Sequence, residues 1–457
     1  LAALSPGWLR RYFWLVSPLI DAAHLLLLYL LSFRLTDSVL AAATAGLIYA
    51  VTPQLISETR NLNGRAFASL LQTMAMVTLL RSVIPGNGPT ASILRLGEAD
   101  SGLYVASVVL IALLYNTHTS TTIALLVSTA TLSLVFGEPR FLLAGALGLP
   151  VAIVISGGYY VRVIQNHLHA ARFWLRNVHL TRAHQVDDSP VVGRSGRGPS
   201  NARGMYHGAL RARLLLGVRL LGENPFIVAM LVTPVPASPW GAHMYWWAVA
   251  ILGWSVLTTF GGPLRILGPG FQYMKASVFP SAYALAVTVN VQEGAYSPVG
   301  AVLLLSVLAS FAALAYFYRV MARRQTEHTA QTPPDLAAAA AYLAGLSGRN
   351  VLVLPSMYAD FVAYAADKAV VWGGHSGDLT RFEEFSPVIR KPLEYFFERY
   401  AVDYLVLDLA YTDPATLRVE GQVDVLREFG AIVVYAVRAA DRPRAAPVSL
   451  AVPVAME

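Results

Sequence analysis

Residues 12–33 read YFWLVSPLIDAAHLLLLYLLSF, and this stretch decides the fold class. A helix needs about 20 mostly apolar residues to cross the hydrocarbon core of a bilayer. The segment supplies them, with Asp21 and His24 as its only ionisable interruptions. Comparable apolar stretches follow at 38–56, 65–84, 102–115, 119–136, 141–156, 242–260, 275–291 and 298–318. A further stretch, 214–235, contains Pro225 and two charged residues, which predicts a kinked or re-entrant helix.

The composition agrees with a polytopic α-helical membrane protein of about nine to ten spans. The chain has 457 residues, of which 56% are hydrophobic and 13% charged, and its mean hydropathy is +0.52. Soluble globular domains carry roughly 25% charged residues, so an ordinary soluble enzyme is excluded. The net charge is +7, and the positively charged residues lie largely between the apolar runs. This placement favours membrane lipid over nucleic acid as the partner. The absence of cysteine excludes disulfides, thiolate zinc sites and cysteine nucleophiles.

The charge balance changes after Arg324. Up to this residue the chain has 23 Lys and Arg against 10 Asp and Glu, whereas the remainder has 11 against 17. Beyond it, short strand-like runs at 350–354, 369–372, 404–409 and 432–437 alternate with helical segments at 335–344 and 387–400. The sequence therefore predicts a transmembrane helical domain at 1–324, a small C-terminal α/β domain with a mostly parallel sheet at 325–440, and a tail at 441–457.

A hydrophilic insertion at 157–213 interrupts the apolar runs. Its first part places Arg162, Arg172 and Arg176 on one helical face and Val161, Leu168 and others on the opposite face, and a basic loop follows. Such a helix is expected in the headgroup plane. An ordinary cytoplasmic loop that follows the positive-inside rule is the alternative, and it stays open.

Ionisable residues at membrane depth are the first candidates for a site, because they cost at least about 2.5 kcal/mol each. Asp21 and His24 lie one helical turn apart and could form a satisfied pair or line a polar cavity. Glu58 and His118, at the polar tips between apolar runs, are further cavity candidates, although a hairpin cap is the competing role for the tip at 116–120.

Cationic residues near the ends of apolar runs are candidates for binding a lipid phosphate. Arg60 precedes the apolar run at 65–84, and Arg65 is its first residue. The planar guanidinium group of arginine suits a phosphate. Arg265 lies just before the string GPGFQYMK at 268–275, and Tyr273 and Lys275 lie within it. Lys275 is the only lysine before Arg324. Structural roles compete here too: Glu58 could pair with an arginine, and Lys275 could snorkel at a helix end.

Motifs for metals and nucleophiles are weak. His167 and His169 are two positions apart and point to different faces of a helix. The string GGHSGD at 373–378 lacks the residues of a phosphate-binding P-loop and cannot form a catalytic triad by itself. No cofactor is therefore assigned, and a divalent cation stays an option.

Several strings together resemble the prokaryotic membrane glycosyltransferases of the GT-C superfamily. They include SPLIDAAHLLLLYLL at 17–31, SGGYYVRVIQNHLHAARFWLRN at 156–177, LGPGFQYMKASVFPSAYALA at 267–286 and the α/β string VLVLPSMYADFVAYAADKAVVWGGHSGD at 351–378. The resemblance implies a polytopic helical domain, a soluble domain near the C-terminus, and sugar transfer from a polyprenyl-phosphate donor at the prokaryotic cell membrane. It also implies an acidic catalytic base in a large first external loop.

The resemblance leaves the catalytic residue unassigned. The chain opens with Leu1, and no Asp or Glu precedes Asp21, so we expect the acidic residue to lie upstream of this sequence. The resemblance places the soluble domain outside the cell, whereas Arg319, Arg323 and Arg324 favour the cytoplasm by the positive-inside rule. We expect the extracytoplasmic side. A transporter or flippase for an anionic lipid or sugar and a non-catalytic membrane subunit remain alternative functions, and protein partners are unidentified.

Overall fold

The computed structural model describes residues 6–59, 65–84, 98–177, 181–182, 185–186, 210–291, 298–329, 333–372, 383–384, 389, 391–410, 414–419 and 421–438. Contacts divide the chain into a helical unit, residues 1–165 with 205–320, and a second unit, residues 166–204 with 321–457, that contains a small sheet. The boundaries at 324 and 440 remain predictions from the sequence, and the predicted tail lies outside the described residues.

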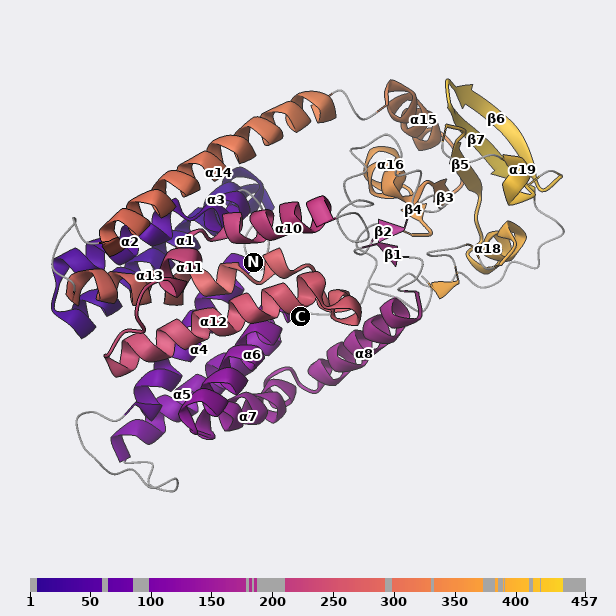
Figure 1. Cartoon of the computed structure of the whole chain (residues 1–457). Coiled ribbons are helices and arrows are strands. Elements are labelled where there is room, and N and C mark those ends of the chain that lie inside the picture. The colour runs from indigo at the N-terminus through magenta and orange to yellow at the C-terminus, as the bar shows by residue number, and fades with distance from the viewer. Residues whose placement is uncertain are drawn as a thin grey trace. The chain divides into compact units, whose positions relative to one another are not determined.

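The helical part of the chain follows the apolar runs closely (Figure 1). Its α-helices are α1 (Pro6–Thr36), α2 (Val39–Val51), α3 (Pro53–Thr59), α4 (Arg65–Val83), α5 (Glu98–Tyr115), α6 (Thr119–Phe136), α7 (Arg140–Ile155), α8 (Tyr159–Asn177), α10 (Leu210–Glu223), α11 (Phe226–Leu231), α12 (Pro239–Phe260), α13 (Lys275–Val291) and α14 (Pro298–Thr329). Two short 3₁₀ helices, η1 (Gly262–Leu267) and η2 (Gly270–Gln272), connect α12 to α13.

Local sequence explains where several of these helices begin and end. Ser38 caps α2 by accepting a hydrogen bond from the backbone N–H of Ala41. Gly137 ends α6 with a left-handed backbone, φ +64°, which glycine adopts without strain. The predicted kink in 214–235 appears as a break between α10 and α11 at Asn224 and Pro225, because a proline cannot continue the hydrogen bonds of the preceding helix.

The helices bury one set of apolar side chains and expose another. Trp247 on α12 and Phe279 on α13 are almost completely buried. In contrast, Leu26 on α1 and Leu304 and Leu305 on α14 are 55%, 60% and 65% exposed. Large exposed apolar surfaces of this kind suit contact with lipid rather than water. The chain is therefore an integral membrane protein, as the sequence predicts.

The number of convincing spans is lower than the sequence indicated. Within the described residues, four helices are long and apolar enough to cross a membrane, at Leu15–Thr36, Arg65–Val83, Thr119–Phe136 and Pro298–Arg319. The bent pair α7 and α8 could add a fifth. The sequence count of nine to ten also included short apolar helices, such as α2 and Ser101–Tyr115, which fall below the length that a full span needs.

The second unit contains a five-stranded sheet in the order β4-β3-β5-β7-β6. The strands are β3 (Asn350–Leu354), β4 (Ala369–Val370), β5 (Tyr404–Asp408), β6 (Val423–Phe429) and β7 (Ile432–Val437). Pairs β3/β4 and β3/β5 are parallel, whereas β5/β7 and β6/β7 are antiparallel. The prediction of a mostly parallel sheet is therefore wrong for its second half, where Gly430, φ +57°, allows a tight β6–β7 hairpin.

Side chains alternate between the two faces of this sheet. Val351, Val353 and Val406 pack with α15 (Pro334–Ala344) and α16 (Ala359–Ala366). On the other face, α18 (Leu393–Arg399) packs against four leucines of β3 and β5, which are Leu352, Leu354, Leu405 and Leu407. The smaller elements of this unit are β1 (Thr181–Arg182), β2 (Gln185–Val186), η3 (Ser356–Tyr358) and α19 (Pro414–Leu417).

Phe396 on α18 provides a test of this core, because its side chain is completely buried against the sheet. We expect Phe396→Ala to destabilise the domain by about 3–5 kcal/mol through lost apolar burial and the cavity left behind. Limited proteolysis of the full chain should then cut the C-terminal domain at lower temperature. Tyr364→Ala is the matched control, because Tyr364 is 91% exposed. Equal protease resistance of the two variants would contradict this packing.

Candidate functional site

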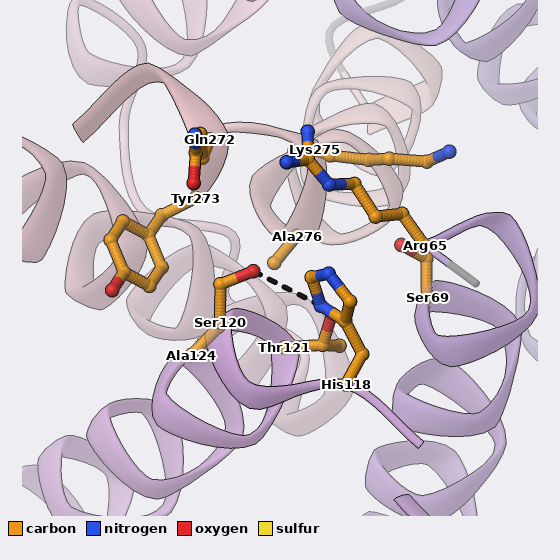
Figure 2. Close-up of a pocket in the computed structure, with 10 residues that line it drawn as sticks. All are labelled: Arg65, Ser69, His118, Ser120, Thr121, Ala124, Gln272, Tyr273, Lys275 and Ala276. Carbon is orange, nitrogen blue, oxygen red and sulfur yellow. Dashed lines mark hydrogen bonds between the residues drawn. The ribbon is translucent and has the colours of Figure 1, made fainter. Parts of the chain in front are cut away.

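Three helices begin at one pocket in the helical unit. Arg65 opens α4, Thr119 opens α6 and Lys275 opens α13. The residues that line the pocket come largely from these first turns and from the segments just before them (Figure 2). They are Arg65, Ser69, His118, Ser120, Thr121, Ala124, Gln272, Tyr273, Lys275 and Ala276. The pocket thus combines two cations with hydroxyl, amide and imidazole groups.

The electrostatics of this pocket favour an anion. Backbone N–H groups in the first turn of a helix lack intrahelical partners, and the helix dipole places partial positive charge at the same end. α6 begins at the pocket with such an end, whereas at the start of α13 the N–H groups of Ala276 and Ser277 already donate to the carbonyl oxygens of Tyr273 and Met274. The side chains of Arg65 and Lys275 add two full positive charges. Among the residues that line the pocket, none is a carboxylate. Phosphate oxygens would match this set of donors.

His118 lies in the short connection just before α6. Its Nδ1 is 3.1 Å from both Ser120 Oγ and Thr121 Oγ1, and Figure 2 shows the bond to Ser120. Burial, together with the nearby charges of Arg65 and Lys275, lowers the pKa of the His118 imidazole to about 4. His118 is therefore neutral near pH 7. It can act as a hydrogen-bond partner in the pocket but does not provide a third positive charge.

Lys275 is held from behind by Asp21 on α1. Lys275 Nζ lies 3.7 Å from Asp21 Oδ1, and the two side chains are only 5% and 12% exposed. A buried ion pair gains little net stability over an apolar pair, but removal of one partner leaves an uncompensated charge. The pair therefore joins α1 to the start of α13 and keeps a charged amine next to the pocket.

A second buried polar contact lies one turn along α1. His24 Nε2 is 2.8 Å from Thr73 Oγ1 on α4. The His24 ring packs edge-on against Tyr49 with centroids 5.1 Å apart, and stacks on Phe279 at 5.3 Å. Asp21 and His24 thus contact different helices instead of forming the local pair that their spacing permitted. Together they connect α1 to α13 and α4, the helices that carry Lys275 and Arg65.

The segment before α13 is fixed against α12. A Cβ atom at Gly270 would collide with the Ser255 carbonyl oxygen, so only glycine permits this close approach. The Tyr273 hydroxyl donates a hydrogen bond to the Leu267 carbonyl oxygen, and the Phe271 ring lies under the Arg219 guanidinium group, 4.4 Å from its centroid. The glycine therefore brings the backbone close to a neighbouring helix rather than to a ligand.

The structure brings four of the predicted site residues together and places two others nearby. Arg65, His118, Tyr273 and Lys275 line the pocket. Tyr273 contributes differently from the prediction, because its hydroxyl is directed away from Arg65 and His118 (Figure 2) and binds Leu267. Asp21 and His24 form the buried contacts described above. The remaining predicted residues give no contacts: Arg60 lies outside the described residues, as do the side chains of Glu58 and Arg265.

Sequence reasoning missed several residues of the pocket. Ser120 and Thr121 follow His118 in a polar tip for which a hairpin cap was the favoured role. Ser69 lies four positions after Arg65, on the same face of α4. Gln272 is part of the GPGFQYMK string but carries no charge that would single it out. Within the described parts of the chain, no group of three or more His, Cys, Asp or Glu residues could hold a metal ion.

Comparisons with known proteins found structural similarities only. No family model matches the chain, and no curated protein matches it. ArnT from Cupriavidus metallidurans in the apo state has 14% sequence identity over 93% of this chain and 83% of that one, with a TM-score of 0.49. The same protein bound to undecaprenyl phosphate has 17% identity over 93% and 84% of the two chains, with a TM-score of 0.47.

The ion pair between Asp21 and Lys275 predicts that each single variant is less stable than the double variant. Asp21→Asn or Lys275→Met alone leaves one buried charge and should destabilise the helical unit by about 3–5 kcal/mol. The double variant removes both charges and should regain most of this loss. Thermal unfolding of the purified chain in detergent would measure all three variants. Losses that simply add in the double variant would show that the two side chains are not coupled.

Proposed function

We propose that this chain is a GT-C-like membrane glycosyltransferase that moves a sugar from a polyprenyl-phosphate-linked donor to an acceptor hydroxyl or amide. The observation that carries the proposal is the pocket in which Arg65 and Lys275 lie together with the N-terminus of α6 in the helical unit. A lipid-linked phosphate is an anion that reaches a site at the ends of membrane-spanning helices without leaving the bilayer. The pocket has the charge for the phosphate, and its hydroxyl and amide groups could bind the sugar.

In the proposed reaction, the bond between the anomeric carbon and the phosphate oxygen breaks while the acceptor oxygen or nitrogen bonds to that carbon. The acceptor proton passes to a general base, and the electron pair leaves with the phosphate. Negative charge therefore grows on the lipid phosphate, where Arg65 and Lys275 would stabilise it. No carboxylate lines the described pocket, so we place the base outside this lining, in keeping with the acidic residue that the resemblance implies.

Binding of undecaprenyl phosphate to the full chain in nanodiscs provides the first test. Arg65→Gln should weaken binding about 10- to 100-fold, the value of a hydrogen bond between charged groups. Lys275 is tested as Asp21→Asn/Lys275→Met, which removes both charges of the ion pair together. Arg81→Gln is the matched control, because Arg81 lies exposed in the last turn of the same helix α4. Equal affinity of the Arg65 and Arg81 variants would remove this pocket from the donor site.

A second measurement separates transfer from transport. With a polyprenyl-phosphate-linked sugar as the donor, a transferase releases polyprenyl phosphate and yields a glycosylated acceptor. A flippase would move the intact donor between the leaflets of a vesicle. Donor binding that depends on Arg65, together with movement of the intact donor and no cleavage, would contradict the transferase and favour the transporter.

We also propose that the C-terminal sheet domain lies on the extracytoplasmic side of a prokaryotic cell membrane. Tyr364 on α16 offers a clean reporter, because its side chain is 91% exposed and the chain has no cysteine. In intact cells, Tyr364→Cys should react with a membrane-impermeant maleimide without lysis. Reaction only after lysis would place the domain in the cytoplasm, in agreement with Arg319, Arg323 and Arg324 and the positive-inside rule.

A further inference from the structure

α8 carries an unpartnered apolar stripe. Val161, Leu168 and Leu175 recur every seven positions, so they lie along one side of the helix. Their side chains are 40%, 54% and 48% exposed. A stripe of large aliphatic side chains along the whole helix is costly to leave in water, which indicates that another apolar phase covers it.

A row of basic residues borders this stripe. Arg162, His169, Arg172 and Arg176 are all exposed. At 3.6 residues per turn they project from the arc beside the stripe, not from the opposite face that the sequence pattern suggested. Arg176 also contacts Glu383 at 3.7 Å in an exposed ion pair. The helix has no acidic residue. Its charge is therefore complementary to an anionic surface, and apolar contact and positive charge lie side by side along its length.

The connection from α7 to α8 changes the chain direction sharply. α7 is apolar after Arg140. α8 follows after a break of three residues and is bent by 119° relative to α7. Gly157 and Gly158 make this turn with φ of +59° and +86°, values that other residues adopt at a cost. α8 therefore lies closer to perpendicular than to parallel with α7. If α7 crosses the membrane, a helix that follows it at this angle can lie roughly parallel to the membrane surface.

We propose that α8 is an in-plane anchor that binds anionic lipid. Its Val161–Leu168–Leu175 stripe enters the upper acyl region, and Arg162 and Arg172 contact lipid phosphates. Length and charge favour lipid over a protein partner, because the stripe runs along the whole helix and the basic row follows it without an acidic interruption. This inference is independent of the proposed transferase activity.

The cysteine-free chain permits a direct test by spin labelling of single cysteines in the full protein, reconstituted in bilayers. Oxygen concentrates in the bilayer, whereas a nickel chelate stays in water. We expect the label at Leu168→Cys to collide several-fold more with oxygen than with nickel, as at Leu305→Cys on α14. The label at Gln165→Cys, on the basic arc, should show the reverse preference, as at Tyr364→Cys.

Two outcomes at Leu168→Cys would overturn the anchor. Nickel accessibility equal to that at Tyr364→Cys would place the stripe in water, and protection from both reagents would show that protein covers it. Lipid charge is tested by raising the phosphatidylglycerol fraction in phosphatidylcholine bilayers. This change should shift the Leu168→Cys label deeper, and the shift should be lost in Arg162→Gln/Arg172→Gln. An unchanged shift in that variant would show that these arginines do not bind the lipid.

Discussion

The contact between Lys275 and Asp21 is a buried ion pair that joins α1 to the start of α13 in the helical unit. Both side chains are almost buried in a membrane protein, where an isolated charge is costly. Each therefore stabilises the charge of the other, and the contact links α1 to the start of α13. Apolar packing alone would be less specific, because leucine-rich helices pack in several registers at similar cost. The ion pair therefore holds the charged amine of Lys275 in place beside the pocket.

The neighbouring features extend the same constraint. His24 contacts Thr73 on α4, the helix that begins at Arg65, and Gly270 brings the segment before Lys275 against α12. The two cations are thus carried by helices that α1 connects through buried polar contacts. Because the donors are fixed before any ligand arrives, an anion would meet them with little reorganisation, which is the condition under which electrostatic stabilisation is most effective.

Residue patterns in the sequence predicted some of this and missed the rest for physical reasons. Apolar runs predicted most helices because membrane burial requires long uninterrupted hydrophobic stretches, and the one lysine before Arg324, Lys275, drew attention to the start of α13. The partner of Lys275 was not predicted, since Asp21 lies more than half the chain away and its spacing suggested His24 instead. β6 was missed because most of its side chains are exposed and do not alternate.

The exposed strand β6 has a consequence for a protein that is confined to a membrane. It forms one edge of the sheet, carries Asp424, Arg427 and Glu428, and has an irregular register with β7 between Val425 and Arg427. Charges and bulges at an edge discourage further strands from joining. Confinement to two dimensions raises the rate at which identical domains meet. Repeated encounters between neighbouring copies can therefore occur without their sheets fusing into a continuous aggregate.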